Sequence, residues 1–193
     1  MFPTPTIGMI GLVEDKELIT SIDFQKSGDK IYVIGEMKED ISSSEYLVGY
    51  HEVNNSPAPY FDLATEVKVQ NAVKKLIYEQ VVLSAHDVSE GGLFTTLLES
   101  AMAGGKGFEI ETESGEDIRK DAFLFGEAQS RVVVSVKQSK EDEFLDIITK
   151  HDVEFSSIGV VTSSLLYVDK VRWGNIGEWR DLYDNALERA LGE

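Results

Sequence analysis

The sequence predicts an α+β protein in which helices pack on a mixed β-sheet. Segments with helical spacing of apolar residues alternate with short β-branched runs along the whole chain. We find no internal repeat, low-complexity tract or long linker that would divide it. With 193 residues, 42% of them hydrophobic, the chain is long enough for one large domain or two small ones with a proper core.

The N-terminal elements begin with an apolar run at residues 6–13, which predicts a strand. A strand that starts this early in a chain usually pairs inside a sheet built from other segments, so the chain is expected to be a piece of a longer polypeptide. A polar connector with a few packed apolar residues follows. The alternating, β-branched run at 30–36 predicts a strand. The serine-rich segment 41–47 is expected to be a loop that opens a short helix through a capping box.

The middle of the chain holds the clearest alternation of elements. Asp62 is expected to cap a helix whose apolar residues recur at helical spacing. The glycines that follow the next helix fit a left-handed C-cap. The expected elements are, in order, a helix at 62–80, a strand at 81–83, a helix at 93–102, a strand at 108–112, a helix at 117–125 and a strong strand at 132–136.

The C-terminal third is expected to contain a helix at 140–150 and two strands at 156–162 and 165–170. Residues 175–191 carry an apolar stripe at helical spacing, which predicts a terminal helix docked on the domain.

Charge and composition narrow the function. The formal net charge is −17, so a nucleic-acid backbone or an anionic membrane surface would be repelled. The chain has no cysteine, which excludes disulfides, thiolate metal sites and cysteine nucleophiles. The N-terminus lacks the basic and apolar regions of a signal peptide, and no apolar run is long enough to cross a bilayer. A small phosphorylated ligand stays compatible with this charge, because a local cradle of N–H groups can act against an acidic background.

The densest cluster of chemically useful side chains lies at residues 84–93, between a predicted strand and a predicted helix. A glycine turn that opens a helix presents free N–H groups and the positive end of the helix dipole, which suits an anion. The cluster matches neither a phosphate-binding P-loop nor a full dinucleotide motif. The alternative is a tight strand–helix corner in which the glycines serve only the turn, and local sequence favours that interpretation. The candidate binding residues here are His86, Asp87, Ser89, Gly91 and Gly92.

A second polar cluster at residues 125–131 runs into the strong strand. Glu127, Gln129 and Ser130 are candidates to hydrogen-bond a polar ligand at the end of the sheet, and equally to cap the preceding helix. Arg131 is either a phosphate partner or the neutralising charge for Glu127.

Catalytic and metal-binding interpretations are weak. His86 and Asp87 are neighbours in an extended strand and point to opposite faces, so they cannot easily hold one metal ion. A triad from Ser84, His86 and Asp87 fails because triad side chains converge from separate segments. We therefore assign no catalytic residue and no metal ligand to this chain.

Four ordered motifs resemble the synthetase of the phosphoribosylformylglycinamidine synthase family, also called formylglycinamide ribonucleotide amidotransferase. They are Pro-Thr-Pro-Thr-Ile-Gly-Met-Ile-Gly-Leu-Val-Glu-Asp at 3–15, Ser-Glu-Tyr at 44–46, Ala-His-Asp-Val-Ser-Glu-Gly-Gly-Leu at 85–93 and Phe-Gly-Glu-Ala-Gln-Ser-Arg at 125–131. The resemblance covers nearly the whole chain, and four ordered motifs are more specific than any one of them.

The resemblance implies a place within that synthetase, which contains two tandem pairs of an A and a B domain related to aminoimidazole ribonucleotide synthetase. Residues 1–15 would be the last strand of a preceding A-type domain, and residues 16–193 the second, C-terminal B-type domain. The implied fold is a three-layer α/β/α domain with a mixed, roughly four-stranded sheet.

The resemblance also implies a reaction. ATP would activate the amide oxygen of formylglycinamide ribonucleotide, and glutamine-derived ammonia would displace it to give formylglycinamidine ribonucleotide, with Mg²⁺ neutralising the triphosphate. The family's catalytic histidine and metal carboxylates lie mainly in the A domains, so this chain alone is expected to be inactive and to bind neither ATP nor Mg²⁺ tightly.

Two positions depart from the family pattern. Ala128 stands where the first B domain of the family has a serine that contributes to the substrate site. Ser42 and Ser43 stand where the family commonly has two glycines. Both changes fit a second-half site that is degenerate or that holds a structural nucleotide.

The expected partners are the remaining synthetase domains and the glutaminase component, without nucleic acid or membrane, in the cytoplasm; whether the chain forms a homodimer is left open. The alternative function is a freestanding scaffold or regulatory module of the same fold that binds a protein partner. A related ATP-using synthetase is disfavoured by the motifs at 3–5 and 127–131.

Overall fold

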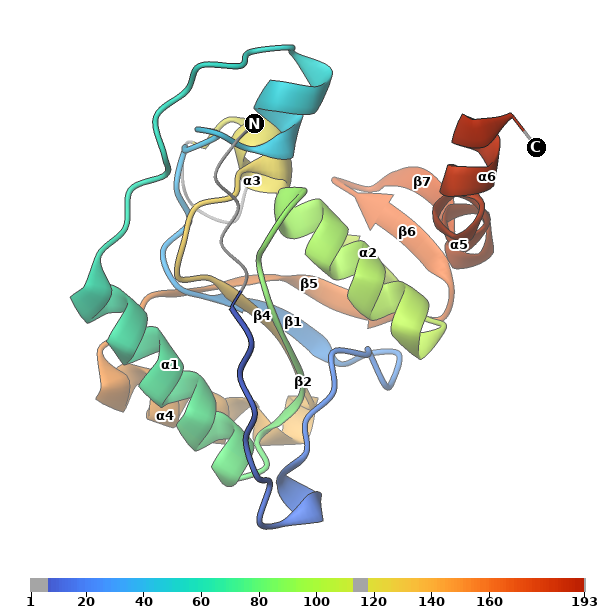
Figure 1. Ribbon diagram of the computed structural model, residues 1–193. Coiled ribbons are helices and arrows are strands. Elements are labelled where there is room, and N and C mark those ends of the chain that lie inside the picture. The colour runs from blue at the N-terminus through green and yellow to red at the C-terminus, as the bar shows by residue number, and fades with distance from the viewer. Residues whose placement is uncertain (1–6, 113–117, 193) are drawn as a thin grey trace.

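The computed structural model describes residues 7–112 and 118–192. It is an α+β domain built on one mixed sheet with helices on both faces (Figure 1). The start of the predicted N-terminal strand and of the helix predicted at 117–125 lies outside these residues. The predicted three-layer fold is confirmed, whereas the count of four strands is wrong, because the sheet has seven.

The sheet has the strand order β2-β4-β1-β5-β3-β6-β7. All neighbouring strands pair antiparallel except β3 and β6, which are parallel. The strands are β1 (Lys30–Ile34), β2 (Val82–Asp87), β3 (Gly107–Ile110), β4 (Val132–Val136), β5 (Phe155–Thr162), β6 (Leu165–Val168) and β7 (Val171–Asn175). β2 is thus an edge strand, and its last residue, Asp87, lies at an open corner of the sheet.

The helices fall into two layers. On one face α1 (Leu63–Tyr78) packs beside α4 (Glu141–His151), and on the other α2 (Gly92–Gly104) packs against both α3 (Lys120–Phe125) and α5 (Ile176–Asp184) (Figure 1). The remaining helical segments are a π-helical turn at Tyr46–Tyr50, two 3₁₀ turns at Lys16–Leu18 and Gln138–Lys140, and α6 (Ala186–Leu191).

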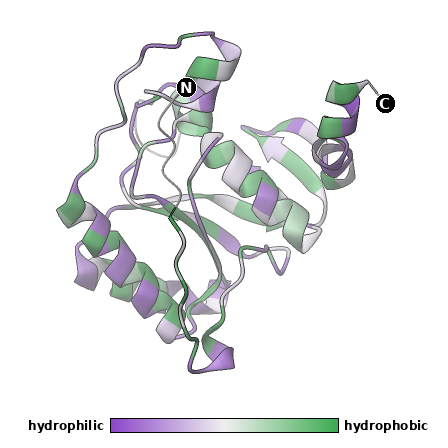
Figure 2. Cartoon of the chain, viewed as in Figure 1, coloured by the Kyte–Doolittle hydropathy of each residue, from purple (hydrophilic) through white to green (hydrophobic). Residues whose placement is uncertain are grey.

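The alternation of β1 explains the two cores. Ile31 and Val33 point to the α2 side and join a core with Leu97. Tyr32 and Ile34 point the other way and pack with α1 and α4. Alternating polar and apolar bands on α1 and α4 show the matching amphipathic pattern (Figure 2). The sheet is therefore buried on both faces at its centre.

Two terminal predictions differ from the structure. The expected docked helix at 175–191 breaks at Asn185 into α5 and α6, and the apolar side chains of Leu182, Leu187 and Leu191 are exposed. Its N-terminal capping box at Asn175 and Glu178 is well formed, so the helix starts where expected. The first half of the predicted helix is docked as expected, because Ile176 is buried and Trp179 packs against the core, whereas the apolar stripe of α6 is exposed.

The N-terminal arm, residues 7–13, forms no strand in the described part of the chain. Its apolar side chains stand in solvent, with Met9 94% and Leu12 96% exposed. The prediction that this run completes a preceding A-type domain stays a prediction, because any partner strand would lie outside this sequence. No helix of the described residues is long and apolar enough to cross a membrane.

Candidate functional site

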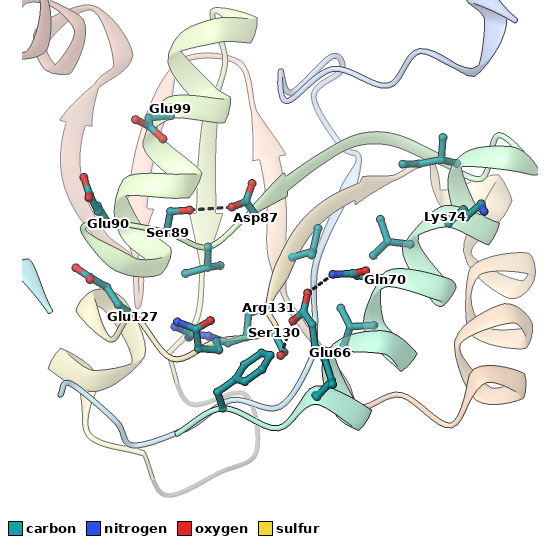
Figure 3. A pocket seen from close by; sticks show the side chains of 18 residues that line it. Glu66, Gln70, Lys74, Asp87, Ser89, Glu90, Glu99, Glu127, Ser130 and Arg131 are labelled. Atoms are coloured by element: carbon teal, nitrogen blue, oxygen red, sulfur yellow. Dashed lines mark hydrogen bonds between the residues drawn. The ribbon is translucent and has the colours of Figure 1, made fainter. Parts of the chain in front are cut away.

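An open groove of about 1270 Å³ lies at the β2 edge of the sheet, and we call it the edge groove (Figure 3). It runs between α1 on one side and the β2–α2 corner on the other, with the segment before β4 at its floor. The residues that line it are Phe61, Leu63, Glu66, Val69, Gln70, Val73, Lys74, Ile77, Asp87, Val88, Ser89, Glu90, Glu99, Glu127, Gln129, Ser130, Arg131 and Val132.

The β2–α2 corner is shaped by two glycines in the left-handed region. Gly91 has φ +80° and Gly92 has φ +71°, which side chains rarely adopt. A Cβ on Gly92 would lie 2.6 Å from the Gly126 carbonyl oxygen and 2.7 Å from the Phe125 carbonyl carbon. The two clusters found in the sequence therefore touch through their backbones. Close packing explains this glycine, as the tight-corner interpretation expects.

The Gly91 N–H at this corner already donates to an anionic group, which is the carboxylate of the chain's own Glu127. One oxygen of its carboxylate accepts hydrogen bonds from the Gly91 N–H and the Glu45 N–H, each at 2.8 Å. Gly91 is the N-cap of α2, and Glu45 is the N-cap of the π-helical turn. A single carboxylate thus caps two helical segments that are distant in sequence. Of the N–H groups that the sequence offered to an anion, that of Gly91 is therefore bonded to Glu127.

Arg131 fixes the backbone on both sides of Glu127. Its Nε donates to the Ala128 carbonyl at 3.0 Å and its Nη2 to the Gly126 carbonyl at 2.7 Å, while the residue is only 2% exposed. Burial lowers the pKa of the guanidinium to about 10, and the carboxylates of Asp40 and Glu127 oppose that shift. Arg131 therefore stays charged at neutral pH and acts mainly on the loop, with a contribution to balancing Glu127.

The floor of the groove is completed by Ser130, which has φ +63° and donates a hydrogen bond from Oγ to Glu66 on α1 at 2.6 Å. This bond joins the 127–131 segment to the opposite wall. Gln129 is exposed and lines the groove. On the other wall, Ser89 Oγ donates to the Asp87 carboxylate at 2.8 Å. Asp87, Ser89, Glu127, Gln129 and Ser130 are thus brought together as predicted.

The other three predicted residues do not line the groove. Gly91 contributes its N–H to Glu127, and Gly92 packs against the 125–126 backbone. His86 points to the α2 face, as the alternation along β2 requires, and its Nδ1 lies 3.0 Å from Ser100 Oγ. Its Nε2 lies 3.6 Å from Glu99. The prediction that His86 shares a site with Asp87 is therefore not supported by this geometry.

Sequence reasoning missed the α1 wall and the role of the 41–47 loop. Glu66 and Gln70 face the groove and are joined by a 2.6 Å hydrogen bond. Their spacing of four residues places them on one helix face, but the local sequence does not show what that face contacts.

In the 41–47 loop, Ser43 adopts φ +51°, a conformation that suits the glycine the family commonly has there. The Ser43 N–H donates to Ser56 Oγ at 3.1 Å, and its hydroxyl donates to the Pro57 carbonyl at 2.8 Å, so both hold the loop in place.

The charges of the groove do not suit a triphosphate. Its lining holds five carboxylates and two cations, Lys74 and Arg131. Arg131 is buried, and its guanidinium donates hydrogen bonds to two backbone carbonyl groups. Across residues 7–112 and 118–192, no three His, Asp or Glu side chains are arranged to hold a metal ion. The donor set of the groove and of the other described residues therefore fits neither Mg²⁺ nor the phosphates of ATP by itself.

A family model described as "AIR synthase related protein, C-terminal domain" matches residues 26–169, three quarters of the chain. The chain belongs to this family. The match begins just before β1 and ends just after β6, so the edge groove and both sequence clusters lie inside the AIR synthase related domain.

Relatives of this domain are parts of longer proteins. The chain is 43% identical over 170 residues to the phosphoribosylformylglycinamidine synthase subunit PurL of Caldanaerobacter subterraneus subsp. tengcongensis, covering 88% of this chain and 23% of that protein. A second PurL subunit, from Moorella thermoacetica, is 40% identical over 82% of this chain and 21% of its own length. The chain spans about a quarter of the relatives it matches.

A solved structure shares the fold. The PurL of T. maritima, solved in complex with FGAR, superposes with a TM-score of 0.72 over 84% of this chain and 29% of that chain. The sequence identity is 16%, so this likeness supports the architecture of the AIR synthase related domain and not the ligand.

Proposed function

We propose that this chain is the C-terminal, B-type domain of a PurL-type synthetase that makes formylglycinamidine ribonucleotide from formylglycinamide ribonucleotide, ATP and glutamine-derived ammonia. The observation that carries the proposal is the 43% identity to a PurL subunit across 88% of this chain. The family match and the four ordered motifs are consistent with it.

The domain is proposed to supply structure and one wall of a site whose reactive groups belong to other segments. Its groove carries no arrangement for metal binding in the described residues, and the Gly91 N–H at its corner is bonded to Glu127. ATP and Mg²⁺ are therefore assigned to the complete enzyme, and the isolated chain is proposed to be inactive. The proposed substrate or nucleotide contacts at Asp87, Ser89, Gln129 and Ser130 require those other segments.

The exposed N-terminal arm supports the proposed domain division. An apolar run that stands fully in solvent costs free energy unless another surface covers it, at about 25 cal/mol per Å². Met9, Ile10 and Leu12 have that exposure, and Gly8 and Gly11 leave room for a close neighbour. We propose that residues 1–15 pair as the last strand of a preceding A-type domain.

The proposed partners are the remaining synthetase domains and a glutaminase component. The relatives are named as subunits of a synthase, which is in keeping with an enzyme of several chains. The cytoplasmic location and the oligomeric state stay predictions.

Two assays test the proposal. The isolated chain, supplied with formylglycinamide ribonucleotide, ATP, Mg²⁺ and ammonium, is expected to form no amidine product, and robust turnover would overturn the claim that it is incomplete. A chimera in which this chain replaces the matching quarter of the Caldanaerobacter subunit is expected to regain ATP-dependent amidine formation. A well-folded but inactive chimera would favour the freestanding scaffold.

A further inference from the structure

The edge groove has two walls of different chemistry, and of their residues only Asp87 has a role in the proposed reaction. One, the acid wall, is made of Asp87 at the end of β2, Glu90 in the corner and Glu99 on α2 (Figure 3). The other, the apolar wall, follows α1 and its approach and consists of Phe61, Leu63, Val73 and Ile77, beside which the polar side chains of Glu66, Gln70 and Lys74 also line the groove. The groove between them is amphipathic along its length.

The acid wall has no internal cation to balance it. In the part of the chain that the structure describes, none of its three carboxylates pairs with a lysine or arginine, and Glu99 lies only near His86, at 3.6 Å. Asp87 and Glu90 are exposed. Close, unbalanced carboxylates around a groove raise the local concentration of cationic groups.

The apolar wall is available for contact. The Phe61 side chain is 50% exposed and that of Leu63 is 66% exposed, while Val73 and Ile77 are half-buried against the core beneath. Along α1, from Leu63 to Ile77, the wall extends for roughly 21 Å, at about 1.5 Å per helical residue. That length and the volume of about 1270 Å³ exceed a typical small-ligand pocket of roughly 300–1,000 Å³ and suit a polypeptide segment of several residues.

We infer that the edge groove docks a basic amphipathic polypeptide segment, with apolar side chains against α1 and lysine or arginine side chains against Asp87, Glu90 and Glu99. The segment belongs to the part of the synthetase polypeptide outside this chain, which in the relatives makes up about three quarters of the protein. That source rests on the proposed function, whereas the chemistry of the segment rests on the two walls alone.

The chemistry is tested with this chain and a fluorescent helical peptide of leucine and lysine at amphipathic spacing. We expect saturable binding that falls roughly tenfold in Asp87→Asn/Glu90→Gln/Glu99→Gln, as for the loss of three exposed charge pairs. The matched control, Glu14→Gln/Asp142→Asn/Glu188→Gln, has the same net charge, removes exposed acids outside the groove, and is expected to bind within about twofold of wild type.

The apolar wall is tested with Phe61→Ser/Leu63→Ser, whose exposed side chains can be replaced without opening the core. We expect severalfold weaker peptide binding in this variant. Equal loss in the control variant would mean that the overall charge alone attracts the peptide. Unchanged binding in either groove variant would overturn docking between the two walls.

The source is tested by crosslinking. Because the chain has no cysteine, Ser89→Cys provides a single attachment point at the groove. With a photo-crosslinker there, and with the rest of the Caldanaerobacter subunit and a glutaminase component added in trans, we expect crosslinks to a lysine- or arginine-bearing segment of the subunit. Crosslinks confined to a separate glutaminase, or absent from a complex that forms, would overturn this source while leaving the activity of the chimera as an independent test of the proposed function.

Discussion

From its hydrogen bonds we predict that Glu127 joins the 125–131 cluster to the 84–93 cluster and to the 41–47 loop. In Glu127→Ala the Gly91 and Glu45 N–H groups, each bonded at 2.8 Å, lose their acceptor. Removal of one N-cap acceptor costs about 1 kcal/mol, so two N-caps give about 2 kcal/mol of unfolding free energy. For a domain of this size that corresponds to a fall in Tm of roughly 4–8 °C.

Glu127→Gln separates the hydrogen bonds from the charge. The amide oxygen can still accept from both N–H groups, so only the interaction of the negative charge with the helix ends is lost, about 0.3–1 kcal/mol. Gln129→Ala is the matched control, because Gln129 is an exposed neighbour in the same segment. We expect it to unfold within about 0.5 kcal/mol of wild type.

Urea unfolding measures these free energies, and amide hydrogen exchange locates them. Exchange at the Gly91 and Glu45 amides should accelerate in Glu127→Ala and stay close to wild type in Gln129→Ala. If Glu127→Ala unfolds like wild type, or if the two amides keep their protection, then Glu127 does not join the 41–47 loop to α2, and our interpretation of the corner is wrong.

Three further changes test other parts of the domain. Gly92→Ala is expected to lose roughly 3–5 kcal/mol in urea unfolding, because its Cβ would meet the Gly126 oxygen at 2.6 Å, whereas Gly105→Ala, also left-handed but in open space, should lose only about 1–2 kcal/mol. Arg131→Lys should cost about 2–4 kcal/mol and expose the Gly91 amide to exchange, since an ammonium cannot hold the two carbonyls as the guanidinium does. Burial and a hydrogen bond to Glu141 raise the pKa of Tyr32 from 10.0 to about 12, so the folded chain holds this proton more tightly and loses stability as the pH rises from 10 to 12. Tyr32→Phe should flatten that fall, and parallel pH profiles for the two proteins would contradict it.

The centre of the fold could be predicted from sequence because its strands carry their own pattern. β1 and β4 are β-branched runs buried on both faces, and both were expected within two residues of their bounds. β7 was missed because Arg172, Gly174 and Asn175 give it neither β-branched density nor clear alternation. It forms because it pairs with β6, so a tertiary contact and not its own sequence pattern determines its structure.

Only the part of the candidate site that lies in two short stretches of sequence could be predicted. The composition of the clusters at 84–93 and 125–131 indicated candidate binding residues, and the glycines correctly indicated a tight corner. The wall contributed by α1 could not be found, because helical spacing identifies an apolar face toward the core but not what the neighbouring polar face will meet. His86 was grouped with Asp87 by adjacency in sequence, although strand alternation sends the two side chains to opposite layers.

The corner and the groove together limit how a phosphate could reach this domain. A phosphate entering this corner would have to displace Glu127 from two N–H groups and would then lie in a groove that also holds Asp87 and Glu90. The groove lining has two cations, and one of them, Arg131, is buried and bonded to backbone carbonyl groups. The other is Lys74, which lies on the α1 side. Two like charges about 4 Å apart repel by roughly 1–4 kcal/mol between bulk water and a protein surface. An anionic ligand can therefore be held here only if other domains bring the cations, and a basic polypeptide segment in the edge groove would bring them.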